Sequence, residues 1–200
     1  ELELLENSLL HLGLGELNSI VEVFGPGRIC NTAAMLGLTC GQAFDLRLVD
    51  PDDNMPWDLS IASKRHKVWW KICELDPWLV IGSPPCDPFS NLHNLGASRA
   101  DPVKRAENIK RGIVHLAFCF AIYRERANRG RYFLHEHPWS AWSWRLDFVQ
   151  HFMRRTDIFL GRGDQCPFGQ FATDWHGPAP VLKPTGWLSN SYYIVRKVAV

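Results

Sequence analysis

Short apolar runs alternate with longer segments of helical periodicity along this chain. The runs that predict strands cover residues 19–24, 41–46, 78–82 and 131–137, and helices are expected at 31–36, 61–75 and 102–128. Parallel neighbouring strands need crossover connections, and a helix is the usual crossover. This order therefore predicts an α/β fold, with a doubly wound, mostly parallel sheet and helices on both faces.

The last quarter of the chain is punctuated by glycine and proline. A tryptophan-rich helix is predicted over 141–155, a short strand over 157–160, and further strands near 180–188 and 191–199. The 200 residues suit one domain, which can bury about 70% of the surface of its unfolded chain. We expect a single domain over 1–200, with a motif-bearing core at about 19–140 and C-terminal strands over 156–200.

Composition limits the kinds of partner. The net charge is +1, so any nucleic-acid surface must be a local basic patch. The six cysteines form no CxxC pair, which indicates an intracellular chain, nuclear or cytoplasmic, without a zinc site. His135 and His137 alternate as metal ligands can, but no third ligand has convincing spacing, so no metal is predicted. No apolar run approaches the roughly 18 residues of a membrane span, and no membrane partner is expected.

A rigid turn follows the apolar run 78–81. Residues 82–90 read Gly-Ser-Pro-Pro-Cys-Asp-Pro-Phe-Ser. Two prolines fix φ for consecutive residues and bias Ser83 towards an extended geometry. Cys86 is thereby presented above the carboxyl end of a strand, which is the edge where open α/β sheets bind ligands.

Other chemistry-bearing residues fall at the same predicted edge. The first strand ends in Phe24-Gly25-Pro26-Gly27, Asp45 closes the second, and Asp58 follows. A glycine turn lets a ligand approach the backbone, and the two acids can accept hydrogen bonds from ribose hydroxyls and an adenine amine. This layout predicts a nucleoside cofactor. A phosphate loop is the weaker reading, because a full GxGxxG is absent.

Taken together, these motifs resemble those of the cytosine-C5 methyltransferases, a Rossmann-like class that uses S-adenosylmethionine. The resemblance covers residues 19 to about 140, and the order and spacing of the motifs agree. It is carried by residues 22–27, 43–45, 57–59, the Pro-Pro-Cys loop at 84–90 and the strand end at 135–138. It implies that S-adenosylmethionine is contacted by Phe24, Gly25, Gly27, Asp45, Asp58, Ser83 and Pro84.

The resemblance also implies a covalent mechanism. The thiolate of Cys86 would add to C6 of cytosine, which turns C5 into a carbon able to attack the methyl group. A carboxyl group near N3, assigned to Glu136, would relieve the charge that addition places on the ring. The substrate would be cytosine in nucleic acid, with DNA favoured over RNA, and a base in a duplex would have to be flipped out.

Some features of the family are missing. Asp87 and His137 stand where the family has Gln and Asn, and the 30 residues after Gln170 are too few for its target-recognition domain. A partner or a further segment is therefore expected to supply target recognition. The basic residues between 104 and 131 could bind nucleic acid or form the solvated face of a helix.

Two alternatives stay open. Amino methyltransferases, acting at N4 or N6, use a Ser/Asn/Asp-Pro-Pro turn in which the first residue accepts from the amine, and Ser83-Pro84-Pro85 fits that pattern. The other alternative is a non-catalytic, methyltransferase-like module that binds nucleic acid.

Overall fold

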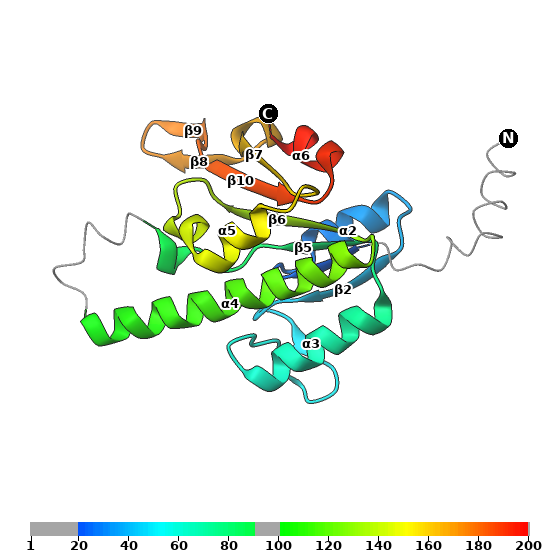
Figure 1. Ribbon diagram of the computed structural model, residues 1–200. Coiled ribbons are helices and arrows are strands. Elements are labelled where there is room, and N and C mark those ends of the chain that lie inside the picture. The colour runs from blue at the N-terminus through cyan, green and yellow to red at the C-terminus, as the bar shows by residue number, and fades with distance from the viewer. Residues whose placement is uncertain (1–19, 91–100, 200) are drawn as a thin grey trace, which may run out of the picture.

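A six-stranded sheet forms the centre of the protein (Figure 1). The computed structural model describes residues 20–90 and 101–199. The sheet order is β2-β1-β5-β6-β10-β7. Its strands are β1 (Ile20–Val23), β2 (Cys40–Phe44), β5 (Leu79–Gly82), β6 (Tyr132–Pro138), β7 (Phe159–Asp164) and β10 (Pro184–Ser189).

The sheet is mostly parallel, as the sequence predicted. β1 pairs in parallel with β2 and β5, and β5 pairs in parallel with β6. β10 lies between β6 and β7 and is antiparallel to both, so it alone runs against the other five strands. The prediction of an α/β fold with a mostly parallel sheet is confirmed.

Five helices and several shorter elements accompany this sheet in the described ranges. The helices are α2 (Arg28–Met35), α3 (Ala62–Leu75), α4 (Pro102–Asn128), α5 (Asp147–Met153) and α6 (Tyr192–Val198). The 3-10 turns are η1 (Asp87–Phe89), η3 (Trp142–Arg145) and η4 (Cys166–Phe168). Two small hairpins pair β3 (Val49–Asp50) with β4 (Met55–Pro56) and β8 (Phe171–Asp174) with β9 (Gly177–Pro180).

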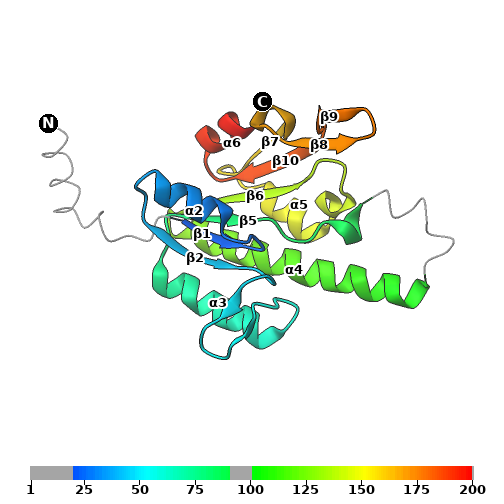
Figure 2. The same cartoon turned by 180° about the vertical axis from the view of Figure 1, so that it is seen from behind.

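The helices lie on both faces of the sheet. Side chains alternate along a strand, so β1 sends Val21 and Val23 into the larger core and Ile20 into the smaller one. α3, α4 and α5 contribute to the larger core, and α2 and α6 contribute to the smaller one. The two opposite views agree, with α4 in front of the sheet in Figure 1 and α2 in front in Figure 2.

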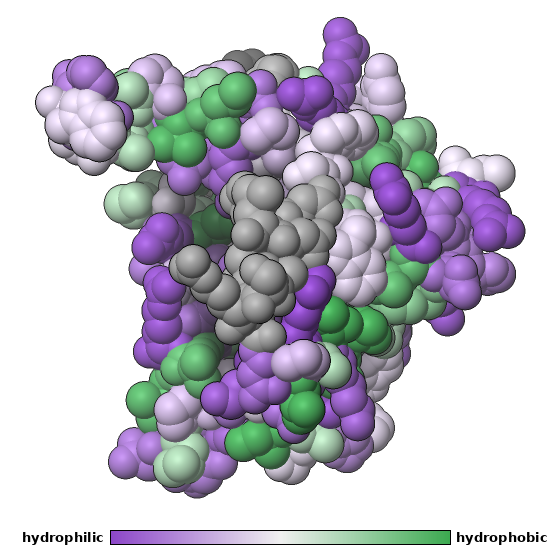
Figure 3. Space-filling view, turned by 90° about the vertical axis from the view of Figure 1, so that its left-hand side faces the viewer, coloured by the Kyte–Doolittle hydropathy of each residue, from purple (hydrophilic) through white to green (hydrophobic). Residues whose placement is uncertain are grey.

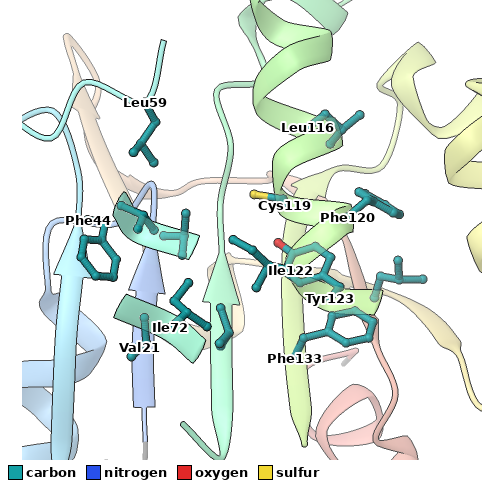
Figure 4. Close-up of a cluster of buried hydrophobic side chains, with 14 of the residues drawn as sticks. Val21, Phe44, Leu59, Ile72, Leu116, Cys119, Phe120, Ile122, Tyr123 and Phe133 are labelled. Atoms are coloured by element: carbon teal, nitrogen blue, oxygen red, sulfur yellow. The ribbon is translucent and has the colours of Figure 1, made fainter. Parts of the chain in front are cut away.

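The larger core is built around α4 (Figure 4). Leu116, Cys119, Phe120 and Tyr123 of that helix belong to this core, with Cys119 on the side towards β5 and Leu116 and Phe120 on the opposite side. The ring of Tyr123 stacks on Phe133 of β6, with centroids 4.6 Å apart. The predicted bounds of this helix, 102–128, match the structure because its apolar stripe and its N-cap, Asp101, are both local signals.

The strand predicted over 191–199 is wrong, because this segment is helix α6. Its tyrosines and β-branched residues favour a strand locally, but the hydroxyl of Ser191 caps a helix by accepting from Ile194 N at 3.4 Å. Glycines on β7 make room for the helix. A Cβ on Gly161 would lie 2.6 Å from Ala199 Cβ and 2.7 Å from Val195 Cγ1.

Three other boundaries differ from the sequence prediction. The helix expected over 141–155 is divided into η3 and α5, because Leu146 between them is extended at φ −64° and ψ 138°. The strand expected at 157–160 spans 159–164, and the one expected at 180–188 is two strands, the end of β9 and all of β10. The C-terminal region is therefore strands followed by a helix.

A buried ion cluster fixes the segment between β2 and α3. Asp50 is fully buried and accepts from Lys64 Nζ at 2.7 Å and from Lys67 Nζ at 2.6 Å. Burial raises the pKa of Asp50, but hydrogen bonds from the two lysines prevail and lower it to about 2. Its carboxylate stays charged at neutral pH and anchors α3.

No helix within the described ranges is long and apolar enough to cross a membrane.

Candidate active site

The predicted site residues gather at the carboxyl ends of the parallel strands. β2 lies on one side of β1 and β5 on the other, so the strand order reverses at β1. In open α/β sheets ligands bind in the crevice outside this reversal point. Figure 3 is turned towards this edge and shows a mixed surface of hydrophilic and hydrophobic residues.

The glycine turn after β1 is held by a buried acid. Glu22 on β1 accepts a hydrogen bond from Cys30 N at 2.7 Å, so its carboxylate occupies the amino-terminal end of α2. A Cβ on Gly25 would lie 2.5 Å from Glu22 Oε2, which is why glycine is needed there. Phe24 and Gly27 have φ values of 59° and 83°. The carboxylate takes the place that a ligand phosphate would occupy at this helix end.

Two adjoining cavities open at this edge. One, of about 160 Å³, is lined by the predicted cofactor residues Phe24, Asp45, Asp58 and Ser83, together with Leu46, Trp57, Leu59, Pro85 and His115. The other, of about 320 Å³, shares Leu46, Asp58, Pro85 and His115 with the first. Small-molecule sites are typically about 300–1,000 Å³. The structure therefore brings four predicted residues from four separate segments around the smaller cavity, and only the adjoining larger cavity, which Asp58 also lines, falls within this range.

The two acids of this crevice also support their own loops. Asp45 Oδ1 accepts from Arg47 N at 3.0 Å, and Asp58 Oδ1 accepts from Ser60 N at 2.9 Å. Hydrogen bonds with Ser60 lower the pKa of Asp58 against the opposing effect of burial. Such turns are a common structural role for Asp. Both acids line the cavity as well, so the same hydrogen bonds hold their carboxylates at its wall.

The Pro-Pro-Cys turn follows β5 as the sequence predicted. Ser83 N donates to Val23 O at 3.1 Å, which ties the turn to β1, and Pro84 is buried beneath it. Cys86 is half-buried. Burial, and then the carboxylates of Asp87 and Glu136, raise the pKa of its thiol. The ammonium group of Lys183 has the opposite effect and lowers it. The resting thiol is therefore protonated at neutral pH.

Glu136 comes to the same edge from β6. Its Oε1 accepts from Lys183 Nζ and from Gln165 Nε2, each at 3.2 Å. The side chain of Glu136 is 18% exposed and that of Lys183 is 40% exposed. Cys86 follows β5 and Glu136 lies on β6, which pairs in parallel with β5, so the two predicted catalytic residues lie at the ends of neighbouring strands. Sequence reasoning missed the contacts of Gln165 and Lys183 with Glu136, since no local signal joins residues so far apart in the chain.

Two histidines lie behind this edge. His135 Nδ1 is 3.1 Å from the hydroxyl of Tyr123, and His137 is buried with neither ring nitrogen hydrogen-bonded. Burial, and then the charge of Lys183, lower the pKa of His137 to about 4, so its ring is neutral. Residues 20–90 and 101–199 contain no group of three or more His, Cys, Asp or Glu that could hold a metal ion.

The other cysteines pack within the fold. Cys30 and Cys119 are buried, while Cys40, Cys73 and Cys166 are half-buried, and all six cysteines are free thiols. Burial, with Glu22 as the next contribution, raises the pKa of Cys30 to about 12. Cys30 and Cys119 are therefore core residues.

The basic residues at 104–131 divide into two groups. Near the end of α4, Arg126 and Arg131 are paired within the protein and bond to Asp76 at 2.8 and 2.6 Å. Those near its beginning include Lys110, which is exposed, and Arg111, which donates to Asn108 Oδ1 at 2.8 Å. Arg111 lines the crevice of about 320 Å³. The group near the beginning of α4 is the one that lies beside the candidate site.

No family model matches this chain, and no curated protein matches it.

Proposed function

We propose that the protein is an S-adenosylmethionine-dependent methyltransferase that acts on C5 of cytosine in nucleic acid. The observation that carries the proposal is that Cys86 and Glu136 lie at the ends of the neighbouring parallel strands β5 and β6, at the sheet edge where Phe24, Asp45 and Asp58 line a cavity. A thiol nucleophile, a carboxyl group and a site for the methyl donor are what this reaction requires.

The proposal includes a finer description of the fold. With α2 and α6 on one face and α3, α4 and α5 on the other, we infer a Rossmann-like, doubly wound sheet. The reversal of strand order at β1 supports this inference.

The crevice residues suit a nucleoside cofactor. Asp45 and Asp58 are placed to accept from ribose hydroxyls and an adenine amine, while Ser83 and Pro84 belong to the turn beside them. Glu22 fills the helix end where a phosphate would bind, which favours a nucleoside without phosphate. S-adenosylmethionine has this character and supplies a methyl group on a sulfonium centre. Gly25 and Gly27 shape the turn that leaves room for it.

Cys86 and Glu136 would divide the chemistry on the base. The Cys86 thiolate forms a bond to C6 of cytosine, and Glu136 in its protonated form donates to N3, so that the ring electrons reach C5. C5 would then form a bond to the methyl carbon as the bond from that carbon to the sulfonium sulfur breaks, so the donor leaves as a neutral thioether. Loss of the C5 proton and of the Cys86 sulfur restores the aromatic ring. Because the resting thiol is protonated, thiolate formation must accompany substrate binding.

The start of α4 is the proposed nucleic-acid surface. Lys104 and Lys110 are exposed, and Arg65 and Arg111 line a cavity with Lys110. Cations beside the candidate site can contact phosphates irrespective of base sequence. DNA is favoured over RNA as substrate. A partner or a further segment would supply target recognition.

A mechanism-based adduct tests the proposal. The protein is incubated with S-adenosylmethionine and 5-fluorocytosine-substituted DNA and RNA, and denatured samples are measured by intact mass. Fluorine at C5 cannot leave as a proton does, so we expect an adduct mapped to Cys86. Cys86→Ser should abolish it, and Cys73→Ser, a matched change at another half-buried thiol, should retain it. Cofactor-bound protein that gives no adduct with either nucleic acid would contradict the proposal.

One observation favours a second candidate. Ser83 and Pro85 line the crevice of about 160 Å³, as the turn of an amino methyltransferase would. If Cys86→Ala retains methyl transfer and the product carries the methyl group on an exocyclic amine, this second function is correct. Nucleic-acid binding without any cofactor binding would instead indicate the non-catalytic module.

A further inference from the structure

His115 is a buried histidine of α4 at the wall of the candidate site. It lines both adjoining cavities, of about 160 and 320 Å³, and is only 8% exposed. Its ring lies beside that of Phe24, with centroids 5.0 Å apart. Its Nε2 has no hydrogen-bond partner among residues 20–90 and 101–199. Most buried polar atoms in folded proteins are hydrogen-bonded, so a ligand in these cavities would complete the bonding of this ring.

The close approach of α4 to the Pro-Pro-Cys turn brings His115 to this position. Gly112 lies three residues earlier, on the same side of the helix. A Cβ on Gly112 would lie 2.8 Å from Pro88 Cγ and 3.1 Å from Phe89 Cζ, so a larger residue would push the helix away. Pro88 and Phe89 belong to η1, which directly follows Cys86. The packing of α4 on this turn therefore holds His115 at the cavities.

Asp58 lines the same two cavities and has the complementary chemistry. Its carboxylate can only accept hydrogen bonds, whereas a neutral imidazole carries one N–H that donates. Burial, and then the charges of Arg65 and Arg111, lower the pKa of His115, so its ring is neutral at neutral pH. An acceptor and a donor on one cavity wall fit a ligand that presents an amine beside a ring nitrogen, and adenine has that pattern.

We propose that His115 is a binding residue for the adenine ring of the cofactor, and that it donates a hydrogen bond to a ring nitrogen while Asp58 accepts one from the amine. This inference rests on the proposed function, since it takes the adenosyl group of S-adenosylmethionine as the ligand of these cavities. Nε2 of His115 carries the hydrogen in this arrangement. An adenine analogue with carbon at that ring position cannot accept the bond, which makes the contact directly testable.

Calorimetric titration with S-adenosylhomocysteine, the product that methyl transfer leaves, measures this contact without any catalysis. The wild type, His115→Phe, His115→Gln and His151→Phe are compared after circular dichroism has established that each is folded. Phenylalanine keeps the ring beside Phe24 but has no N–H to donate, and glutamine restores one. We expect His115→Phe to weaken binding about three- to tenfold and His115→Gln to recover part of that loss. His151 is an exposed histidine on α5, so His151→Phe should bind as the wild type does.

Analogues with carbon in place of N1 or N7 of adenine identify the ring nitrogen. In the wild type, either the 1-deaza or the 7-deaza analogue of S-adenosylhomocysteine should bind about three- to tenfold more weakly than the parent compound. In His115→Phe the same analogue should bind about as well as the parent, because the hydrogen bond that it lacks is already absent.

The outcomes separate this inference from the proposed function. Unchanged affinity in His115→Phe, or equal sensitivity to the deaza analogues in the wild type and His115→Phe, would overturn the role of His115. A wild type that binds neither S-adenosylhomocysteine nor adenosine would overturn it as well. If affinity depends on His115 as expected but no 5-fluorocytosine adduct forms, the adenine contact stands and the proposed function fails. If the adduct forms while affinity is independent of His115, the proposed function stands and this inference fails.

Discussion

Gly82 offers a sharp test of how the core supports the candidate site. It is the last residue of β5 and precedes the Ser-Pro-Pro-Cys turn. A Cβ at this position would overlap the hydroxyl of Tyr123 and lie 3.0 Å from Tyr123 Cζ. Tyr123 cannot easily move away, because it is fully buried, stacks on Phe133 and bonds to His135. Gly82→Ala must therefore displace the ring or the strand end.

The expected magnitude follows from two opposing effects. Overpacking a core costs about 1–3 kcal/mol, while replacing a strand glycine with alanine recovers about 0.5–1 kcal/mol. We expect Gly82→Ala to lower the free energy of unfolding by about 1–2 kcal/mol. Tyr123→Phe should cost about 1 kcal/mol through its hydrogen bond with His135. In the double variant the overlap with the hydroxyl is gone. Its loss of unfolding free energy should therefore be about 1 kcal/mol smaller than the sum of the losses of the two single variants.

Urea unfolding followed by tryptophan fluorescence measures these free energies. Tyr132→Phe is the matched control, because Tyr132 is 40% exposed and should combine additively with Gly82→Ala. A neutral Gly82→Ala, or additivity within about 0.5 kcal/mol with Tyr123→Phe, would refute the reasoning. Displacement of the strand end should also change the rate of Cys86 alkylation in Gly82→Ala.

Three further predictions concern other regions. Because the pKa of Asp50 is lowered to about 2, its carboxylate stabilises the fold above its ordinary pKa, and this stabilisation is lost as the pH falls through about 2. Asp50→Asn should therefore make the unfolding free energy fall less steeply with acid. An unchanged dependence on acid pH would contradict the ion pair with Lys64. Lys110→Gln should weaken nucleic-acid binding and reduce the slope of log K against log salt by about 1. Arg124→Gln, at the other end of α4, should change neither. Filter binding at several salt concentrations measures both quantities. Gly161→Ala should destabilise the protein by about 1–3 kcal/mol in thermal unfolding, and a neutral result would show that α6 packs less tightly on β7 than its contacts indicate.

Much of the parallel half of the sheet could be predicted from the sequence. The strands at 20–23, 79–82 and 132–138 and the helix at 102–128 each carry their signal locally, as apolar runs, stripes, caps or glycine and proline boundaries. The positions of Cys86 and Asp45 followed from the same patterns, because a residue that follows a parallel strand must reach one edge of the sheet, whereas Asp58 reaches that edge after the small β3–β4 hairpin. Local propensity gave the wrong secondary structure where packing between distant segments determines it. The segment 191–199 was predicted as a strand but is a helix, because glycines on β7 leave room for it.

An α/β chain with a thiol at 86 and carboxyl groups at 45, 58 and 136 near one edge of the sheet could be read from the amino-acid order alone. Which charged groups contact these residues depends on how distant segments pack together. Lys183 and Gln165 reach Glu136 because one strand is inserted antiparallel between two others, and Glu22 caps α2 because β1 and α2 fold back on each other. Such contacts join residues distant in the chain, and the electrostatic state of a thiol depends on the groups around it in space rather than on its sequence neighbours.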